Sequence, residues 1–357
     1  MIVSVQYLRA VAALMVVFYH LVPQLERMGW HATGLDWLSS GVDIFFVISG
    51  FIMWTTTSGG TTSPLAFYEK RLIRIVPLYW ILTTFTLVLL LTMPRLLQSS
   101  ALRWDHVIAS YLFVPALHPV KPTMEPLVMP GWTLNYEMFF YMVFGLALLL
   151  PQKIRVSAVA TIFILLVGLG RWVENRQSVT GFYTSSIILE FLFGMLVGRL
   201  HESRRSLAAR WAWPAILIGV GFIAAAGSLK STELRAFLWG LPATLLMLGV
   251  LALDRNRRVI DLRWARLLGD ASYSIYLVHG IILSAVSQGW RAIGLATVSG
   301  GLVGFAVTAA SCAAIGGVLL FLLVEQPALR WCRSLRLNPA GPGDGSRTLV
   351  LRQNDNS

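Results

Sequence analysis

The segment VQYLRAVAALMVVFYHL, residues 5–21, decides the fold class of this chain. Few polar groups interrupt its apolar side chains, chiefly Gln6, Arg9 and His20. A run of this length suits an α-helix that crosses the hydrocarbon core of a bilayer. The first basic residue, Arg9, lies inside the run, and no small-residue cleavage site with the usual flanks follows it. We therefore expect a retained first membrane span over residues 4–24 and not a cleaved signal peptide.

Similar apolar runs recur along the rest of the chain. They predict an all-α, polytopic integral membrane helix bundle with about ten transmembrane helices. The expected spans cover residues 4–24, 41–57, 75–94, 132–150, 157–171, 183–200, 211–227, 236–253, 270–290 and 294–324. The runs are long and continuous, whereas the strands of a membrane β-barrel are short and alternate apolar with polar residues.

The composition excludes the common soluble classes. Of the 357 residues, 56% are hydrophobic and 13% are charged. So few charges cannot cover the surface of a soluble protein of this size. A disordered chain, a coiled coil and an ordinary cytosolic enzyme are therefore not expected.

The net charge of +12 is explained by membrane topology. It arises from 29 Lys and Arg residues against 17 Asp and Glu residues. If the N-terminus is cytoplasmic, most of the basic residues fall on cytoplasmic loops, as the positive-inside rule requires. An even number of spans then places both termini in the cytoplasm. We therefore expect no nucleic-acid partner.

The chain is expected to form a single membrane domain with a short tail. Residues 1–335 hold all the apolar runs, and residues 336–357 are polar and rich in Gly and Pro, which predicts a disordered cytoplasmic tail. The longest connection, residues 95–131, is rich in proline. Its semi-apolar stretch 107–114 predicts a re-entrant or interfacial helix.

Arg9 and His20 are ionisable residues within the first span, where charge is costly. Their separation corresponds to about three helical turns plus about 20°, so both side chains project from nearly the same face. The rise between them is about 16 Å. The alternatives are an interfacial anchor for Arg9 and a hydrogen-bonded packing residue for His20.

Two carboxylates are expected near the depth of His20. Asp43 opens the second span in GVDIFFVISGF, residues 41–51, and Glu137 lies in GWTLNYEMFFY, residues 131–141. Asp43 could instead be a helix N-terminal charge favoured by the macrodipole. An imidazole near carboxylates suits general acid–base catalysis.

Arg71 and Arg74 lie in FYEKRLIRIVPLYW, residues 67–80, at the expected cytoplasmic interface. Their spacing places them on one helical face. They are either topology signals or ligands for phosphate, which suits the planar guanidinium fork.

Three further ionisable residues lie in or at the ends of spans. His279 in SYSIYLVHG is better explained as a hydrogen-bonded packing residue, and Glu325 is expected to pair with a basic residue at the inner end of the last span. Glu190 has no partner that the sequence identifies. The roles of all three stay open.

Taken in chain order, the motifs resemble the membrane acyltransferase-3 family over about residues 3–335. They are the Arg9–His20 pair, GVDIFFVISGF, FYEKRLIRIVPLY and SYSIYLVH. The opening segment is similar to the bacterial branch that acetylates exopolysaccharides. By motif, Arg9 and His20 match the essential pair of the family, and Arg71 and Arg74 match its basic motif, which is implicated in binding coenzyme A. Phosphates of coenzyme A held near Arg9, Arg71 and Arg74 could let the thioester reach the depth of His20.

The resemblance implies a multi-pass O-acyltransferase of the bacterial inner membrane, embedded in its lipids. Such an enzyme takes an acyl group, usually acetyl, from cytoplasmic acetyl-CoA and needs no metal. It places the group on a hydroxyl of an exopolysaccharide, another surface glycan or a lipid-linked oligosaccharide. We hypothesise that His20 deprotonates that hydroxyl. Asp43 or Glu137 would orient its imidazole, as the acid does in a catalytic triad.

Several alternatives stay open at this level. The buried ions could line the path of a transporter for a glycan precursor or small molecule, or the protein could be a sensor without chemistry. The acceptor, the choice between acetyl, succinyl and other acyl groups, and the oligomeric state are not determined. Nor does the sequence separate direct transfer from an acyl-histidine intermediate.

Overall fold

A computed structural model of the protein describes residues 2–31, 33–59, 62–94, 101–203, 207–227, 229 and 233–337. Within these ranges every regular element is a helix. The expected tail, apart from its first two residues, lies outside the described residues.

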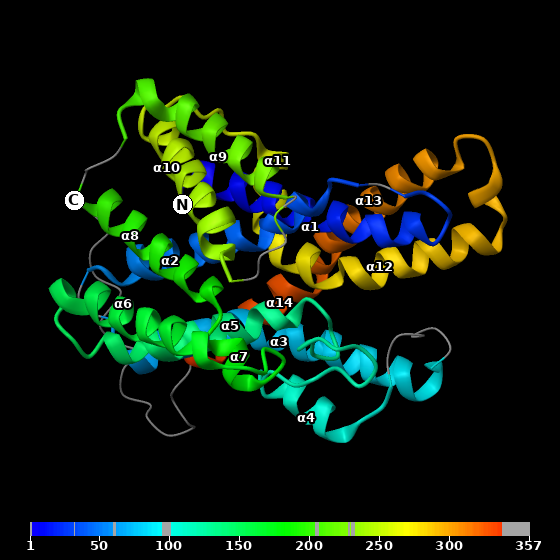
Figure 1. The fold of residues 1–357 in the computed structure, drawn as a ribbon, viewed down its shortest axis with the longest axis horizontal. Coiled ribbons are helices and arrows are strands. Elements are labelled where there is room, and N and C mark those ends of the chain that lie inside the picture. Colours follow the sequence, from blue (N-terminus) through cyan, green and yellow to red (C-terminus); the bar gives the residue numbers. More distant parts are fainter. Residues whose placement is uncertain are drawn as a thin grey trace, which may run out of the picture.

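The principal helices follow one another as antiparallel and crossed segments of a bundle (Figure 1). They are α1 (Val3–Glu26), α2 (Gly41–Thr57), α3 (Pro64–Thr92), α4 (Trp104–Tyr111), α5 (Gly131–Ala147), α6 (Gln152–Leu169), α7 (Val179–Tyr183), α8 (Leu189–Glu202), α9 (Ala212–Ala226), α10 (Leu241–Arg255), α11 (Arg263–Asp270), α12 (Ser272–Ala292), α13 (Gly301–Leu320) and α14 (Gln326–Leu337). Short 3₁₀ helices include η1 (Asp36–Ser40), before α2.

Eight helical segments of the described chain are long and apolar enough to cross a membrane, and a ninth is counted if a bent pair forms one span. That pair is α11 and α12, which meet at 70°. α5, which corresponds to the expected span 132–150, has 17 residues and is about 26 Å long. The protein is therefore a multi-pass membrane protein.

The helix that corresponds to the expected span 75–94 begins well before that span. α3 begins at Pro64 and continues through Pro77, so Arg71 and Arg74 lie on the same continuous helix as the apolar run that follows them. Ser63 caps this helix, because its Oγ accepts a hydrogen bond from the backbone N–H of Ala66 at 3.2 Å.

α2 and α8 are the most deeply buried spans and pack directly against each other. Glycines make this contact possible. A Cβ on Gly50 would lie 2.0 Å from the carbonyl oxygen of Phe191, and a Cβ on Gly194 would lie 2.0 Å from that of Val47. Gly198 likewise faces Trp54. The Gly194–Gly198 pair is therefore used for packing within the chain.

Around this pair, α1 packs against α2, α11 and α12, while α9 packs on α10 and α12 on α13. The α12–α13 hairpin projects to one side of the molecule (Figure 1). Two π-helical turns interrupt the bundle, η6 (Ala236–Gly240) before α10 and η8 (Phe321–Glu325) before α14. Such turns often occur at functional sites because they re-aim side chains.

Candidate active site

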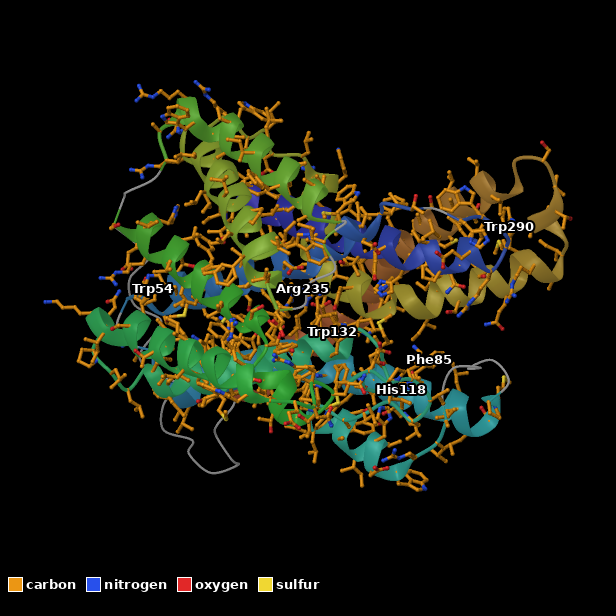
Figure 2. The ribbon with its side chains drawn as sticks, in the orientation of Figure 1. Trp54, Phe85, His118, Trp132, Arg235 and Trp290 are labelled. Atoms are coloured by element: carbon orange, nitrogen blue, oxygen red, sulfur yellow. The ribbon has the colours of Figure 1, made fainter. Side chains whose placement is uncertain are left out.

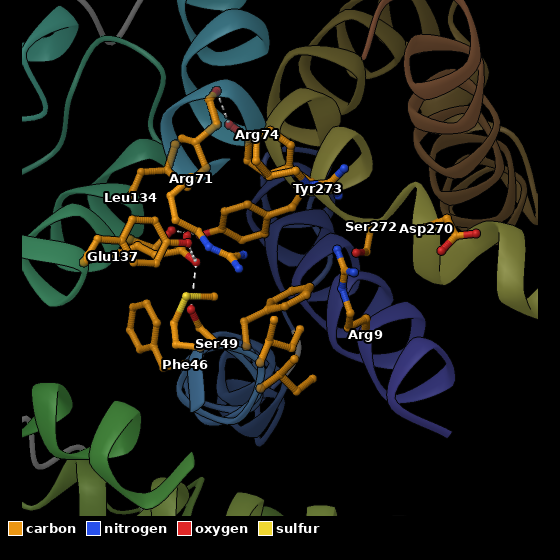
Figure 3. Close-up of a pocket in the computed structure, with 18 of the residues that line it drawn as sticks. Arg9, Phe46, Ser49, Arg71, Arg74, Leu134, Glu137, Asp270, Ser272 and Tyr273 are labelled. Atoms are coloured by element: carbon orange, nitrogen blue, oxygen red, sulfur yellow. Dashed lines mark hydrogen bonds between the residues drawn. The ribbon is translucent and has the colours of Figure 1, made fainter. Parts of the chain in front are cut away.

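A cavity of about 660 Å³ opens among the helices and gathers most of the basic residues that the sequence singled out. We call it the basic cavity. Its charged lining residues are Arg9, Lys70, Arg71, Arg74, Glu137, Asp270 and Arg333. Figure 3 shows that Arg9 comes from α1 and that Arg71 and Arg74 come from α3. Residues far apart in the sequence therefore converge on one site with an excess of positive charge.

The arginines of the basic cavity differ in how their charges are satisfied. Arg74 Nη1 forms an ion pair of 2.7 Å with Oε1 of Glu325, and Ser274 Oγ donates to Oε2 of the same carboxylate at 2.6 Å. This confirms the expected pairing of Glu325 with a basic residue. Among the described residues no carboxylate lies within ion-pair distance of Arg9 or Arg71. Their charges are available for an anionic ligand.

Arg9 and Arg71 are held by neutral side chains. Arg9 Nη1 donates to Gln6 Oε1 at 3.3 Å, and Arg71 Nη2 donates to Thr56 Oγ1 at 3.3 Å. Contacts of this length leave both guanidinium forks free to rearrange around phosphate oxygens.

Glu137 lies in the basic cavity and not beside His20. Its Oε1 accepts hydrogen bonds from Ser49 Oγ at 2.9 Å and from Tyr141 Oη at 2.6 Å. The sequence had grouped Glu137 with His20 because both were expected near the outer end of their spans. α5 begins at Gly131, within one residue of the expected span, so Glu137 has its expected place along the helix, but its side chain contacts Ser49 and Tyr141 and not His20.

His20 lines a second cavity of about 470 Å³, which we call the His20 cavity. Its wall is aromatic and mildly acidic, with Tyr19, Asp36, Glu125, Trp132, Arg235, Trp239 and Tyr276 among its lining residues. Much of this wall comes from η1 and from the connections that precede α5 and η6. The basic cavity, by contrast, is lined almost entirely by residues of long helices.

The two cavities meet at Val42 and Tyr276, because both residues line both cavities. Tyr276 is 7% exposed, and its Oη lies 2.9 Å from Thr133 Oγ1. Among the described residues, only these two side chains are common to both walls. The partition between the anion-attracting cavity and the His20 cavity is therefore thin.

The imidazole of His20 contacts a second histidine. His279, on α12, is fully buried, and its Nε2 lies 3.2 Å from His20 Nδ1. His279 Nδ1 lies 2.6 Å from the carbonyl oxygen of Tyr276, and His20 Nδ1 lies 3.0 Å from that of Val16. His279 is hydrogen-bonded, as the sequence suggested, but the sequence carried no signal that its partner is His20.

Asp43 is fully buried and forms an ion pair with Arg235. Arg235 Nε donates to Oδ1 at 2.9 Å and Nη2 donates to Oδ2 at 2.8 Å. The sequence did not single out Arg235. Its position directly before the apolar run 236–253 was the only available signal.

Arg235 links Asp43 to the wall of the His20 cavity. Its guanidinium carbon lies 5.0 Å from the ring centre of Trp239 and 6.0 Å from that of Trp132, and Figure 2 shows Trp132 beside Arg235. Among the described residues neither Asp43 nor Glu137 hydrogen-bonds to His20. The expectation that one of these carboxylates orients the imidazole is therefore not met by this geometry.

Glu190 lies fully buried next to Gly240, whose added Cβ would approach its Cγ to 2.6 Å. Neither of its oxygens has a hydrogen-bond partner in the part of the chain that the structure describes. No cluster of three or more His, Cys, Asp or Glu side chains suited to a metal ion is found among these residues either.

The bundle and its two adjoining cavities define a multi-pass membrane protein with a polar site between its helices. Residues 2–317 match the family described as an acyltransferase domain, and the chain belongs to this acyltransferase-3 family. The protein is therefore a membrane acyltransferase.

Two curated proteins extend the comparison. The chain is 38% identical over 323 residues to the exopolysaccharide production protein ExoZ of Rhizobium meliloti (strain 1021), covering 87% of this chain and 95% of that protein. It is 27% identical over 322 residues to nodulation protein 10 of Rhizobium leguminosarum bv. viciae, covering 79% of this chain and 83% of that protein. No solved structure matches significantly.

Proposed function

We propose that this protein transfers an acetyl group from cytoplasmic acetyl-CoA to a hydroxyl of an exopolysaccharide or its lipid-linked precursor. The observation that carries the proposal is the thin partition, formed by Val42 and Tyr276, between the basic cavity and the His20 cavity. The likeness to ExoZ, an exopolysaccharide production protein, supports the class of acceptor.

The basic cavity suits the donor. Arg9 and Arg71 offer charges without carboxylate partners among the described residues, and coenzyme A carries its phosphates at one end and its thioester at the other. The rise along α1 from Arg9 to His20 is about 16 Å. Phosphates held at the arginines would therefore leave an extended pantetheine arm pointing toward the partition and His20.

The His20 cavity suits the acceptor. Trp132, Trp239 and Tyr19 supply amphipathic aromatic surface, and Asp36 and Glu125 supply acceptors for sugar hydroxyls. An apolar wall with a few placed polar groups is the usual chemistry of a site that orients a neutral ring. The phosphates of the donor are better matched by the basic cavity.

The chemical step is a direct acyl transfer. His20 Nε2 takes the proton of the acceptor hydroxyl, whose oxygen forms an ester bond with the acetyl carbonyl carbon. The carbon–sulfur bond breaks, and the thiolate of coenzyme A leaves and takes up the proton from the imidazolium. Asp43 holds Arg235 in the wall of the His20 cavity, where the acceptor binds. Glu137 lines the basic cavity, where the donor binds.

The topology follows from the same assignment. With the basic cavity toward the cytoplasm, the positive-inside rule places both termini on that side. α5 and the bent α11–α12 pair then bring the eight long segments to ten spans. The site lies in the inner membrane of a bacterium, and only the acetyl group crosses the partition.

Loss of the base tests the proposal. Purified protein in nanodiscs is given [¹⁴C]acetyl-CoA and deacetylated exopolysaccharide. We expect His20→Ala to lower transfer by about 10²- to 10⁴-fold, while His31→Ala, a change of an exposed histidine beyond the same helix, leaves it unchanged. Transfer at the wild-type rate by His20→Ala would refute the base assignment. Flux of a glycan without label transfer would favour the transporter.

Loss of charge tests the donor site. We expect Arg71→Gln to weaken acetyl-CoA binding measured by calorimetry, by about tenfold for one charge-assisted contact. Arg210→Gln, which removes an exposed arginine outside both cavities, serves as the matched control. Equal affinity of wild-type and Arg71→Gln protein would reject the basic cavity as the donor site.

A further inference from the structure

We propose that His279 is a positioning residue that fixes the His20 imidazole in one tautomer, with the proton on Nδ1 and the lone pair on Nε2. This inference rests on the proposed function of His20 as the base. It is argued from the chain of contacts that runs from the Tyr276 carbonyl through His279 to His20.

The first link sets the tautomer of His279. Its Nδ1 lies 2.6 Å from the carbonyl oxygen of Tyr276. A carbonyl oxygen can only accept a hydrogen bond, so Nδ1 must carry a proton. A neutral imidazole has one proton, and a charged one would be costly in a fully buried position within the bundle. His279 Nε2 therefore carries a lone pair.

The second link sets the tautomer of His20. Its Nδ1 lies 3.0 Å from the carbonyl oxygen of Val16 and 3.2 Å from Nε2 of His279. Both neighbours are acceptors, so His20 Nδ1 must be the donor and shares its proton between them. The opposite direction, donation from His279 to His20, would leave Nδ1 without a proton against the Val16 carbonyl. One arrangement alone satisfies both carbonyls.

The consequence is a base aimed at the acceptor. With its proton on Nδ1, His20 has its lone pair on Nε2, and no described residue hydrogen-bonds to that nitrogen. His20 lines the His20 cavity, where an acceptor hydroxyl would lie. In a catalytic triad a carboxylate performs this orienting task. Here a neutral histidine performs it, which avoids a further charge inside the membrane domain.

A spectroscopic experiment tests the tautomer without any substrate. Full-length protein labelled with [¹⁵N]histidine is placed in nanodiscs, and the signals of His20 and His279 are assigned by difference from His20→Ala and His279→Phe. We expect wild-type His20 to show a protonated Nδ1 and an unprotonated Nε2 at neutral pH. The Val16 carbonyl, 3.0 Å from His20 Nδ1, still favours the same tautomer in His279→Phe, so we expect this variant to populate the second tautomer only in part. A protonated Nε2 on wild-type His20 would overturn the proposal.

A kinetic experiment tests the consequence, with the same exopolysaccharide assay. We expect His279→Phe to lower kcat at least about tenfold with KM for acetyl-CoA unchanged, since an orienting contact acts on the transition state. His279→Gln keeps an acceptor and a donor and should restore both the rate and the single tautomer. Ser287→Ala, a buried change on the same helix away from His20, controls for packing of α12.

The two proposals fail in different ways. If wild-type protein shows the expected tautomer but transfers no label, the proposed function is wrong and the orientation of His20 stands. If His279→Phe keeps wild-type kcat and a single His20 tautomer while His20→Ala is inactive, the base assignment stands and His279 is a packing residue.

Discussion

Asparagine at position 43 would remove the carboxylate that pairs with the Arg235 guanidinium inside the bundle. Asp43 is fully buried, and the side chain of Arg235 is 19% exposed. The pair is joined by two charge-assisted hydrogen bonds of 2.9 and 2.8 Å. The change Asp43→Asn removes the charge, weakens one hydrogen bond, replaces the acceptor of the other with an NH2 group and keeps the volume of the side chain.

The expected magnitude follows from burial. Removing one partner of a buried ion pair costs about 3–5 kcal/mol, because the remaining charge is left without compensation. Since Arg235 keeps some exposure and the carboxyl group of Glu190 interacts electrostatically with it, we expect the lower end, about 3 kcal/mol. Removing both charges with Asp43→Asn/Arg235→Gln leaves no orphan ion, so the double variant should lie closer to the wild type than the sum of the single variants. The coupling free energy should be about 2 kcal/mol.

The assay is unfolding of the purified protein by SDS in mixed micelles, followed by tryptophan fluorescence. The chain has 13 tryptophans, so the signal reports on unfolding of the whole bundle, and Trp132 and Trp239 beside Arg235 contribute to it. The four proteins of the double-mutant cycle are compared at one lipid composition. A parallel cycle at Arg103 and Asp105, an ion pair on the surface, should show no measurable coupling.

A coupling free energy below about 0.5 kcal/mol at Asp43 and Arg235 would refute the reasoning, because separate sites add within that range. We also expect Asp43→Asn to lower acyl transfer while leaving acetyl-CoA affinity unchanged, since Arg235 lies in the wall of the His20 cavity. If Asp43→Asn lowered only the affinity for acetyl-CoA, Asp43 would act on the basic cavity and not on the His20 cavity, against this prediction.

Three further outcomes are expected. Gly194→Ile should abolish folding, because its Cβ alone would approach the Val47 carbonyl to 2.0 Å; a monodisperse, active variant would contradict the packing argument. Burial, with Lys121 adding, lowers the pKa of His118, whose neutral Nδ1 accepts two backbone hydrogen bonds of 3.2 Å. Stability should therefore fall as pH drops below about 6.5, and His118→Asn should flatten that pH profile. Tyr276→Ala should raise hydrolysis of acetyl-CoA without acceptor several-fold, measured as released thiol, since it opens the partition; an unchanged rate would contradict that role.

The sequence predicted the fold class because long apolar runs have few alternatives to membrane helices. It also predicted that Arg9, Arg71 and Arg74 act together, and the structure brings all three to the basic cavity. This prediction rested on the spacing of the arginines along single helices and on their expected position at the cytoplasmic ends of the spans. Their roles as ligands for coenzyme A stay a prediction.

The sequence could not predict contacts between distant helices. His20 and His279 meet because α1 packs on α12, a pairing that leaves no mark in the periodicity of either segment. The sequence did not single out Arg235, since its partner Asp43 lies on α2 and is remote in the chain. Glu137 was grouped with His20 because the position of a residue along a span does not show which neighbouring helix its side chain contacts; α5 begins within one residue of the expected span, yet Glu137 bonds to Ser49 and Tyr141.

The two cavities are lined by different kinds of elements, and this affects how each can change during evolution. The basic cavity is formed by long helices, where a substitution disturbs the packing of the bundle, whereas much of the His20 cavity is formed by η1 and connecting segments. Connections tolerate substitution and insertion far better than packed helices do. Under the proposed function, descendants of one ancestor could come to decorate different polymers through changes in these connections alone. The basic cavity, which binds the acyl donor, would stay the same in all these descendants.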